Sequence, residues 1–216
     1  MKGTAKRYDA AYFEHWYRRS GVGVGRAEFV ERKVRLALAA AEYVLGRPAR
    51  SVLDVGCGEG PYGDLFEAAS RAGSIRYVGL DPDARRIEAL RARWPWAELR
   101  VASAEDPTDL HADHVLMLRS WNHLRNPVRA VETFAGALRG EGTLLVVDNV
   151  AFGLVRGRLH AQRAEGGAAV FEHHRNDGAR EAHATITDAA PDLRLLERHD
   201  VSPATSNQWL LRYQKP

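Results

Sequence analysis

The sequence has little of what marks a secreted or membrane-bound protein. Its 216 residues include one cysteine, so no internal disulfide can form, which is typical of a reducing compartment. No apolar run is long enough to span a bilayer, because the most apolar helical stretch, residues 36–45, is short and contains Glu42. Residues 1–19 are charged and aromatic and do not resemble a signal peptide. We therefore expect a soluble, cytoplasmic protein with no membrane partner.

Lysine is also scarce, and the excess of positive charge is small. The 31 basic residues oppose 28 acidic ones, for a net charge of +3, and 27 of the 31 are arginine. Pairs such as Arg18–Arg19 and Arg85–Arg86 are scattered among acidic residues. A protein that binds nucleic acid usually collects its positive charge on one face or arm. The charge pattern thus argues against a nucleic-acid partner.

Strand and helix patterns alternate through the middle of the chain. At about 150 residues per domain, the length fits a single domain over residues 1–216. Short apolar runs predict strands at residues 51–55, 76–80, 98–102, 115–118 and 143–147. Stretches between them predict helices at residues 62–69, 84–94 and 128–138, the last of them ended by Gly140. Such alternation builds a parallel sheet covered by helices on both faces.

The two ends of the chain have other patterns. Aromatic residues at helical spacing, among them Tyr12 and Trp16, precede a long apolar stripe from Val30 to Val44, and both predict helices. Residues 193–201 and 208–213 resemble an antiparallel hairpin at the sheet edge. A polar stretch with several histidines separates this hairpin from the core, and we interpret it as an insertion over the active face. The predicted organisation is cap helices at 1–46, a core at 51–147, the insertion at 151–190 and the edge hairpin at 193–214.

The first predicted strand runs into a glycine-rich loop, Asp54-Val-Gly56-Cys57-Gly58-Glu-Gly60-Pro61. Glycines here let the backbone turn sharply and approach a ligand, and the following helix points its free N–H groups at the same place. The dinucleotide fingerprint G-x-G-x-x-G fits poorly, because Pro61 stands at its last glycine or inside its phosphate turn, depending on the register. An acid two residues before the first glycine would repel a pyrophosphate but can accept hydrogen bonds from an ammonium group.

The pattern Asp54-x-Gly56-x-Gly58-x-Gly60 resembles motif I of the class I S-adenosylmethionine-dependent methyltransferases. Four later segments are similar to further motifs of that family, in the same order: Gly79-Leu-Asp81-Pro82, Val101-Ala-Ser103-Ala104-Glu105-Asp106, Leu118-Arg119-Ser120-Trp-Asn-His123 and Leu138-Arg-Gly-Glu-Gly-Thr-Leu-Leu-Val-Val147. The resemblance covers residues 51–147. It implies a Rossmann-like, doubly wound α/β fold with a mostly parallel seven-stranded sheet, an antiparallel edge hairpin and a helical N-terminal cap. It also implies S-adenosyl-L-methionine as the cofactor.

The resemblance assigns ten residues to the cofactor: Asp54, Gly56, Cys57, Gly58, Asp81, Pro82, Ser103, Ala104, Glu105 and Arg119. It implies that Asp81 binds the ribose hydroxyls, since a carboxylate can accept both hydroxyl hydrogens. It places the adenine beside the segment that contains Glu105. Simpler roles stay open for three of these residues: Cys57 as a small buried filler, Asp81 as a helix cap and Glu105 as a solvated loop acid.

Methyl transfer from a sulfonium is an in-line displacement, in which the protein mainly aligns the acceptor and excludes water. A hydroxyl or ammonium acceptor must also lose a proton, and His123 is the candidate base, with a structural role as the alternative. We assign His173 and His174 to the acceptor side, although adjacent residues on a strand face opposite sides and a solvated polar lid is the alternative. Tyr12 and Trp16 would, by the resemblance, fold over the site, or else pack in the core.

Asp148-Asn149 is similar to the Asp-Asn pair of metal-dependent catechol-type O-methyltransferases, and oxygen ligands of that kind suit Mg²⁺. The third acid of that set would follow the fourth strand, where this chain has Arg119-Ser120. We therefore expect no metal and assign Asn149 to the acceptor. The same segment also departs from the Asp/Asn-Pro-Pro-aromatic motif of the base-amino methyltransferases of nucleic acids, which again argues against a nucleic-acid acceptor.

The resemblance thus implies methyl transfer from S-adenosylmethionine to the O-, N- or C-nucleophile of a small-molecule acceptor. Two alternatives use the same cofactor pocket. One is a non-catalytic S-adenosylmethionine-binding partner protein, and the other is a different transferase, such as an aminopropyl transferase. The acidic glycine loop and Asp81 suit all three, so turnover is what separates them.

Overall fold

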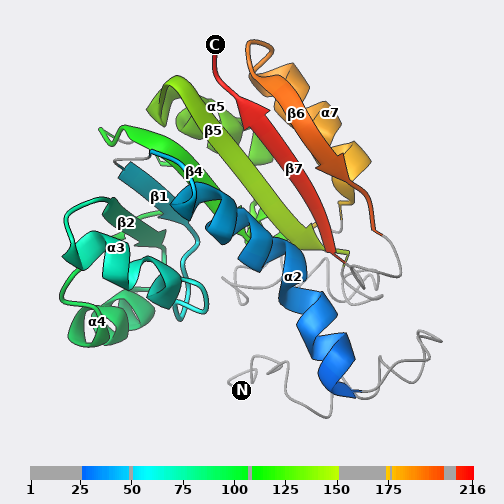
Figure 1. The fold of residues 1–216 in the computed structure, drawn as a ribbon. Coiled ribbons are helices and arrows are strands. Elements are labelled where there is room, and N and C mark those ends of the chain that lie inside the picture. Colours follow the sequence, from blue (N-terminus) through cyan, green and yellow to red (C-terminus); the bar gives the residue numbers. More distant parts are fainter. Residues whose placement is uncertain (1–25, 49–50, 107–108, 151–173, 176, 202–207) are drawn as a thin grey trace, which may run out of the picture.

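The computed structural model describes residues 26–48, 51–106, 109–150, 174–175, 177–201 and 208–216. They form one seven-stranded sheet with the strand order β3-β2-β1-β4-β5-β7-β6 (Figure 1). The strands are β1 (Ser51–Val55), β2 (Arg76–Asp81), β3 (Glu98–Val101), β4 (Ala112–Leu118), β5 (Leu138–Asn149), β6 (Arg194–His199) and β7 (Gln208–Gln214). Strands from β3 to β5 pair in parallel, and β7 pairs antiparallel with β5 and β6. The predicted mostly parallel sheet with its antiparallel edge hairpin is confirmed.

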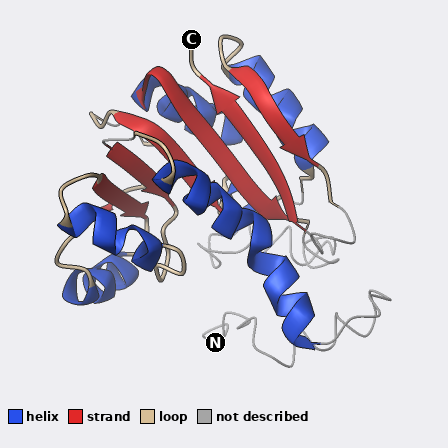
Figure 2. Cartoon of the chain, in the orientation of Figure 1, coloured by secondary structure: helices blue, strands red, loops and turns tan. Residues whose placement is uncertain are grey.

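Helices cover both faces of this sheet (Figure 2). The helices of one face are α2 (Arg26–Leu45), α3 (Glu67–Arg71) and α4 (Ala84–Arg93), and those of the other are α5 (Pro127–Ala137) and α7 (Ala179–Ala189). Two short 3₁₀ helices, η1 (Gly63–Phe66) and η2 (Trp121–His123), follow β1 and β4. Because β1 is buried on both sides, Val52 packs with α2 and α4, whereas Leu53 packs with α5 and α7. This is why β1 reads as a continuous apolar run and not as an alternating one.

Local sequence signals predict the start of α5 correctly but not its end. The Asn126 side chain accepts a hydrogen bond from the Arg129 N–H, and Pro127 occupies the first turn, where its missing N–H costs nothing. The helix ends at Ala137, and β5 begins at the next residue. The prediction that Gly140 ends this helix is therefore wrong, because Gly140 lies within β5.

The 151–190 segment was predicted as an insertion over the active face, but part of it packs in the core instead. Its last section is α7, which buries Ala182 and Ile186 in the core shared with α5 and the sheet. Residues 151–173, which include His173, lie outside the described residues, as do Tyr12 and Trp16. The helical cap is described from α2 onward, and α2 contacts the sheet through a hydrogen bond from the Leu36 N–H to Oε1 of Gln208, 3.1 Å long.

Within the described part of the chain, no helix combines the length and the apolar character needed to cross a membrane.

Candidate functional site at the carboxyl edge of the sheet

The parallel strands β1, β2, β4 and β5 end at one edge of the sheet, and the segments that follow them meet there. The backbone N–H groups of Gly56 and Cys57 both donate to the Leu80 carbonyl, at 2.8 and 2.9 Å. On the other side of β1, the Ser120 hydroxyl donates to the Val55 carbonyl at 2.8 Å. The loop after β1 is thus held against β2 and against the segment after β4. In an open parallel sheet, the carboxyl ends of the strands are where ligands bind.

Glycine is favoured at two positions of this loop for different physical reasons. Gly56 has a φ of 74°, and a Cβ at this position would lie 2.5 Å from Cβ of Ser120, so no larger residue fits. Gly58 also has a positive φ, 56°, but its Cβ would meet nothing closer than 3.8 Å. The nearest atoms on that side belong to Arg86 and to the carboxylate of Asp81. A Cβ at Gly58 would therefore be in ordinary van der Waals contact with Arg86 and with the Asp81 carboxylate, without a clash.

Asp81 joins the glycine loop to the turn after β2. Its Oδ2 accepts the Gly58 N–H and its Oδ1 accepts the Asp83 N–H, both at 2.9 Å. The cap of α4 is Asp83, whose side chain accepts from Arg85 and Arg86. The interpretation of Asp81 as the helix cap is therefore wrong. Each Asp81 oxygen keeps a lone pair for a further donor.

Asp54 lies beneath the loop, on the side of α2 and α4. It is 4% exposed, and its Oδ2 accepts a hydrogen bond from the Tyr77 hydroxyl at 2.5 Å. Burial raises the pKa of Asp54 to about 6, the hydrogen bond from Tyr77 lowers it, and the charge of Asp81 raises it. Two carboxylates therefore flank the glycine loop, and they favour a cationic ligand group between them.

Cys57 has the properties of a packing residue. It is 3% exposed, and its sulfur would lie 3.0 Å from a Cβ built on Gly79 of β2. Burial, followed by the charges of Asp54 and Asp81, raises the pKa of its thiol well above the usual range. A thiol held neutral in this way is a poor nucleophile. This geometry supports the interpretation of Cys57 as a small buried filler.

The segment after β3 forms a turn in which the Glu105 carboxylate accepts backbone hydrogen bonds. Its Oε1 accepts the backbone N–H groups of Arg125 and Asn126, at 2.8 and 2.9 Å, and thereby fixes the approach to α5. The Ser103 hydroxyl accepts the Glu105 N–H at 3.2 Å. Beside this turn is a pocket of about 230 Å³, lined by Ser103 together with residues of β2, β3 and α5.

Arg119 directly follows β4 and has an unusual backbone conformation. Its φ is 65°, which a residue with a side chain rarely adopts, and its N–H donates to the Val147 carbonyl at 2.6 Å. Its Nε is buried and makes no hydrogen bond within the described part of the chain. Backbone strain of this kind persists where the surrounding structure enforces it, and it is common at functional sites.

Asp148 fixes the segment that follows Arg119. The carboxylate is fully buried and accepts the backbone N–H of Asn122 at 2.7 Å and that of Asn149 at 2.6 Å. Burial raises its pKa to about 6, against the lowering effect of these two bonds and of the Arg119 charge. Because each carboxylate oxygen of Asp148 accepts a backbone N–H group, Asp148 has a structural role that differs from metal binding. Within the described residues, no group of three His, Cys, Asp or Glu side chains is arranged to hold a metal ion.

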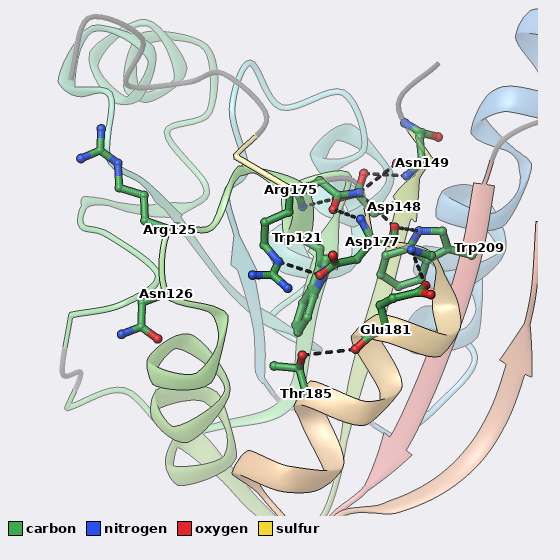
Figure 3. A network of polar contacts seen from close by, with 12 residues as sticks. Trp121, Arg125, Asn126, Asp148, Asn149, Arg175, Asp177, Glu181, Thr185 and Trp209 are labelled. Carbon is green, nitrogen blue, oxygen red and sulfur yellow. Dashed lines mark hydrogen bonds and ion pairs between the residues drawn. The ribbon is translucent and has the colours of Figure 1, made fainter. Parts of the chain in front are cut away.

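Asp177 completes this network from the segment before α7 (Figure 3). Its N–H donates to Oδ1 of Asn122, and its Oδ2 accepts from Nε1 of Trp121 at 3.1 Å and from Nε of Arg175 at 2.6 Å. Its carbonyl accepts Nε1 of Trp209 at 2.9 Å. Residues from η2, β5, β7 and the approach to α7 are thus joined around one buried side chain, Asn122.

The candidate acceptor residues lie around this network. His123 closes η2 and is half-buried, directly after Asn122. The His174 N–H donates to the Asn122 carbonyl at 2.9 Å. Asn149 is 7% exposed, and its Oδ1 has no hydrogen-bond partner among the described residues. The structure therefore brings His123, His174 and Asn149 to one end of the sheet.

Four residues of this site were not predicted from the sequence: Tyr77, Asn122, Ser120 and Asp177. Tyr77 reads as one more apolar residue of a buried strand, and its partner Asp54 is 23 residues away. Asn122 and Asp177 are 55 residues apart, and no local pattern connects them. A small residue could have been expected at position 120, because the side chain that packs against the backbone of Gly56 has little space.

Comparison with known proteins agrees with this geometry. A family profile described as "Methyltransferase domain" matches residues 26–200. A probable S-adenosylmethionine-dependent methyltransferase of Mycobacterium tuberculosis is 36% identical over 100 residues, which is 45% of this chain and 35% of that protein. The chain therefore spans about a third of the length of the relative it matches.

Solved structures share the fold at low sequence identity. The 1,6-didemethyltoxoflavin-N1-methyltransferase of Burkholderia thailandensis, solved with bound 1,6-didemethyltoxoflavin and S-adenosylhomocysteine, is 16% identical. Its TM-score is 0.61, over 95% of this chain and 85% of that one. A TehB-like methyltransferase of Corynebacterium glutamicum is 15% identical with a TM-score of 0.58, over 95% and 97% of the two chains.

Proposed function

Because the chain belongs to the methyltransferase-domain family, we propose that it transfers a methyl group from S-adenosylmethionine to a small-molecule acceptor. The relatives named S-adenosylmethionine-dependent methyltransferases support the cofactor. The observation that carries the proposal is the contact between the Gly58 N–H of the glycine loop and the Asp81 carboxylate at the end of β2. The single cysteine supports a reducing compartment such as the cytoplasm.

The residues at the carboxyl edge fit the parts of this cofactor. The spare lone pairs of Asp81 suit the two ribose hydroxyls. The adenine would lie beside Pro82 and the Ser103–Glu105 turn, where Ser103 lines the adjoining pocket. Asp54 and Asp81 together supply the negative potential that an ammonium and a sulfonium need. For Glu105, its two bonds to backbone N–H groups favour shaping of the adenine pocket over a direct contact.

When bound, S-adenosylmethionine supplies an electrophilic methyl group whose bond to sulfur breaks as the bond to the acceptor forms. The chain's own part is alignment and removal of a proton. Arg119 and the buried Asn122 network hold the segment after β4 against the end of β5. A fixed segment keeps the acceptor in line with the methyl group, and such alignment lowers the barrier of a bimolecular step.

On the acceptor side we assign His123 as the proton acceptor when the nucleophile is a hydroxyl or an ammonium group. Asn149 is assigned to hydrogen bonding of the acceptor, because its buried Oδ1 makes no bond within the described residues. A buried amide oxygen left without a donor costs free energy, which a ligand N–H or O–H would recover. His174 flanks the same place through its backbone contact with Asn122.

Thermal unfolding with and without cofactor tests the binding step. S-adenosylmethionine and S-adenosylhomocysteine should each raise the melting temperature of the wild-type protein, because a ligand that binds only the folded state stabilises it. Asp81→Ala should lose most of that shift. Asp192→Ala is the matched control, since Asp192 is exposed in the turn before β6, at the opposite end of the sheet from the glycine loop. Absence of a shift with either ligand would contradict cofactor binding.

Turnover is tested by incubating the protein with S-adenosylmethionine carrying a labelled methyl group and with panels of hydroxyl, amine and carbon acceptors. Label transferred to a small molecule supports the proposed activity. Binding without transfer to any panel would favour a non-catalytic cofactor-binding protein. A parallel incubation with decarboxylated S-adenosylmethionine would identify an aminopropyl transferase, through transfer of the aminopropyl group and release of methylthioadenosine.

A further inference from the structure

We propose that Tyr77 is a positioning residue for the cofactor's ammonium group, which it serves by holding the Asp54 carboxylate beneath the glycine loop. The inference rests on the proposed function, in which Asp54 faces that ammonium. Tyr77 itself touches neither the cofactor nor the reacting atoms. Its effect passes through one hydrogen bond.

The geometry of the pair follows from the register of β1 and β2. Val52 lies opposite Tyr77, and Asp54 lies opposite Gly79, so Asp54 and Tyr77 occupy diagonal positions on one face of the sheet. A tyrosine side chain reaches a diagonal neighbour. Its hydroxyl donates to Oδ2 of Asp54 at 2.5 Å, and both residues are nearly inaccessible to water, at 2% and 4% exposure.

Aromatic rings hold Tyr77 in place. The centroid of its ring lies 5.3 Å from that of Phe66, 5.4 Å from that of Trp96 and 6.0 Å from that of Trp94, the last in an edge-on contact. Trp94 is itself held by a hydrogen bond from its Nε1 to Asp64 at 2.7 Å. The phenol oxygen therefore has little freedom, and the carboxylate that it binds keeps one orientation.

The charges around Asp54 explain why a donor is needed there. Asp81 at the end of β2 is a second negative charge, and the Cys57 thiol of the loop is neutral. Arg86 of α4 acts on Cys57, and Asp64 of η1 acts on Tyr77. Burial and Asp81 together favour the protonated acid, whereas the Tyr77 hydrogen bond favours the carboxylate. Without Tyr77 the pKa of Asp54 would rise above its value of about 6, and a neutral acid attracts an ammonium group weakly.

Calorimetric titration with S-adenosylhomocysteine between pH 5.5 and 8.5 tests the proposal, using the wild type, Tyr77→Phe and Asp54→Asn. Wild-type affinity should fall as the pH drops toward 6. Tyr77→Phe should lose about tenfold in affinity at pH 7. Its affinity should begin to fall at a higher pH than that of the wild type, so that part of the loss is recovered at pH 8.5. Asp54→Asn should bind weakly with a flat profile.

Tyr213→Phe is the matched control. Tyr213 is also a buried tyrosine with a short polar contact, 2.5 Å from its hydroxyl to Nδ1 of His183, but it lies in β7 on the other face of the sheet, so its substitution should change neither the affinity nor its pH dependence. The double variant Asp54→Asn, Tyr77→Phe should bind no more weakly than Asp54→Asn alone, because Tyr77 acts through Asp54.

A Tyr77→Phe profile identical to that of the wild type would overturn the proposal. So would a loss of affinity that is equal at every pH, or one that adds to the loss in Asp54→Asn, because either result means that Tyr77 serves only the packing. Failure of the wild type to bind S-adenosylhomocysteine at any pH would instead overturn the proposed function, and the proposed role of Tyr77 with it.

Discussion

Asn122 donates its backbone N–H to Oδ2 of Asp148 over 2.7 Å, which ties the segment after β4 to the end of β5. The other Asp148 oxygen accepts the Asn149 N–H, and the side chain is fully buried. A carboxylate without water keeps its place only when donors satisfy it. This contact therefore fixes the position of His123, the next residue, relative to β5.

Asp148→Ala should destabilise the fold strongly. The substitution leaves two buried backbone N–H groups without acceptors, and we expect the free energy of unfolding to fall by about 2–4 kcal/mol. Urea unfolding followed by fluorescence measures this, because Trp121 and Trp209 are buried beside the network. Asp109→Ala, an exposed partner of Arg100, should change stability by less than about 0.5 kcal/mol. Equal effects of the two variants would contradict the role given to Asp148.

The raised pKa of Asp148 has a consequence for pH. Burial raises this pKa from 3.8 to about 6, so the folded protein keeps a proton that the unfolded chain has already lost. The stability contributed by the protonated acid is full below pH 3.8 and is lost as the pH rises to about 6. Relative to Asp148→Asn, which cannot ionise, the wild type should lose about 3 kcal/mol over this range. Urea unfolding at pH 4 and pH 7 measures the difference, and a pH-independent difference would contradict it.

The fold was predictable to a large extent because its signals are local. β1, α4 and the glycine loop are each marked by residues within a few positions of one another, such as Asp54, Gly56 and Gly58. The contacts that position these residues were not predictable, because they join strands that only the folded sheet brings together. Tyr77 with Asp54 and Asn122 with Asp177 are examples. The place of α7 was missed for a related reason, since a polar helix with one buried stripe reads much like an exposed insertion.

Two glycine substitutions should separate close approach from conformational strain. Gly56→Ala places a Cβ 2.5 Å from Ser120 at a φ of 74°, so we expect a loss of about 3 kcal/mol and poor folding. Gly58→Ala makes only ordinary van der Waals contacts, the nearest at 3.8 Å, and should cost only about 1–2 kcal/mol from its positive φ. Its new methyl group lies beside Asp81, however, so affinity for S-adenosylhomocysteine should fall. Thermal melting and calorimetry measure the two effects, and equal melting temperatures would contradict the distinction.

Glu105→Ala tests whether this side chain anchors a loop or contacts adenine. The substitution removes the acceptor for the Arg125 and Asn126 N–H groups, which are at the surface, so we expect a loss of about 1 kcal/mol. Affinity for S-adenosylhomocysteine should change less than threefold. Glu105→Gln keeps an acceptor oxygen and should restore most of the stability. A tenfold loss of affinity with unchanged stability would instead support a direct contact with the adenine.

His123→Gln separates proton transfer from positioning, once an acceptor has been found. Glutamine keeps polarity and approximate size but cannot take up a proton at neutral pH, so methyl transfer to a hydroxyl or ammonium acceptor should slow by about 10²–10⁴-fold. Affinity for S-adenosylhomocysteine should stay unchanged, because the network fixes this segment through the backbone of Asn122 and not through the imidazole. Asn122→Ala is the contrasting variant, since it removes the side chain that binds Asn149 and Asp177 and should lower stability and transfer together. Unchanged transfer in His123→Gln would mean that the acceptor reaches the methyl group already deprotonated. The chain would then contribute alignment alone.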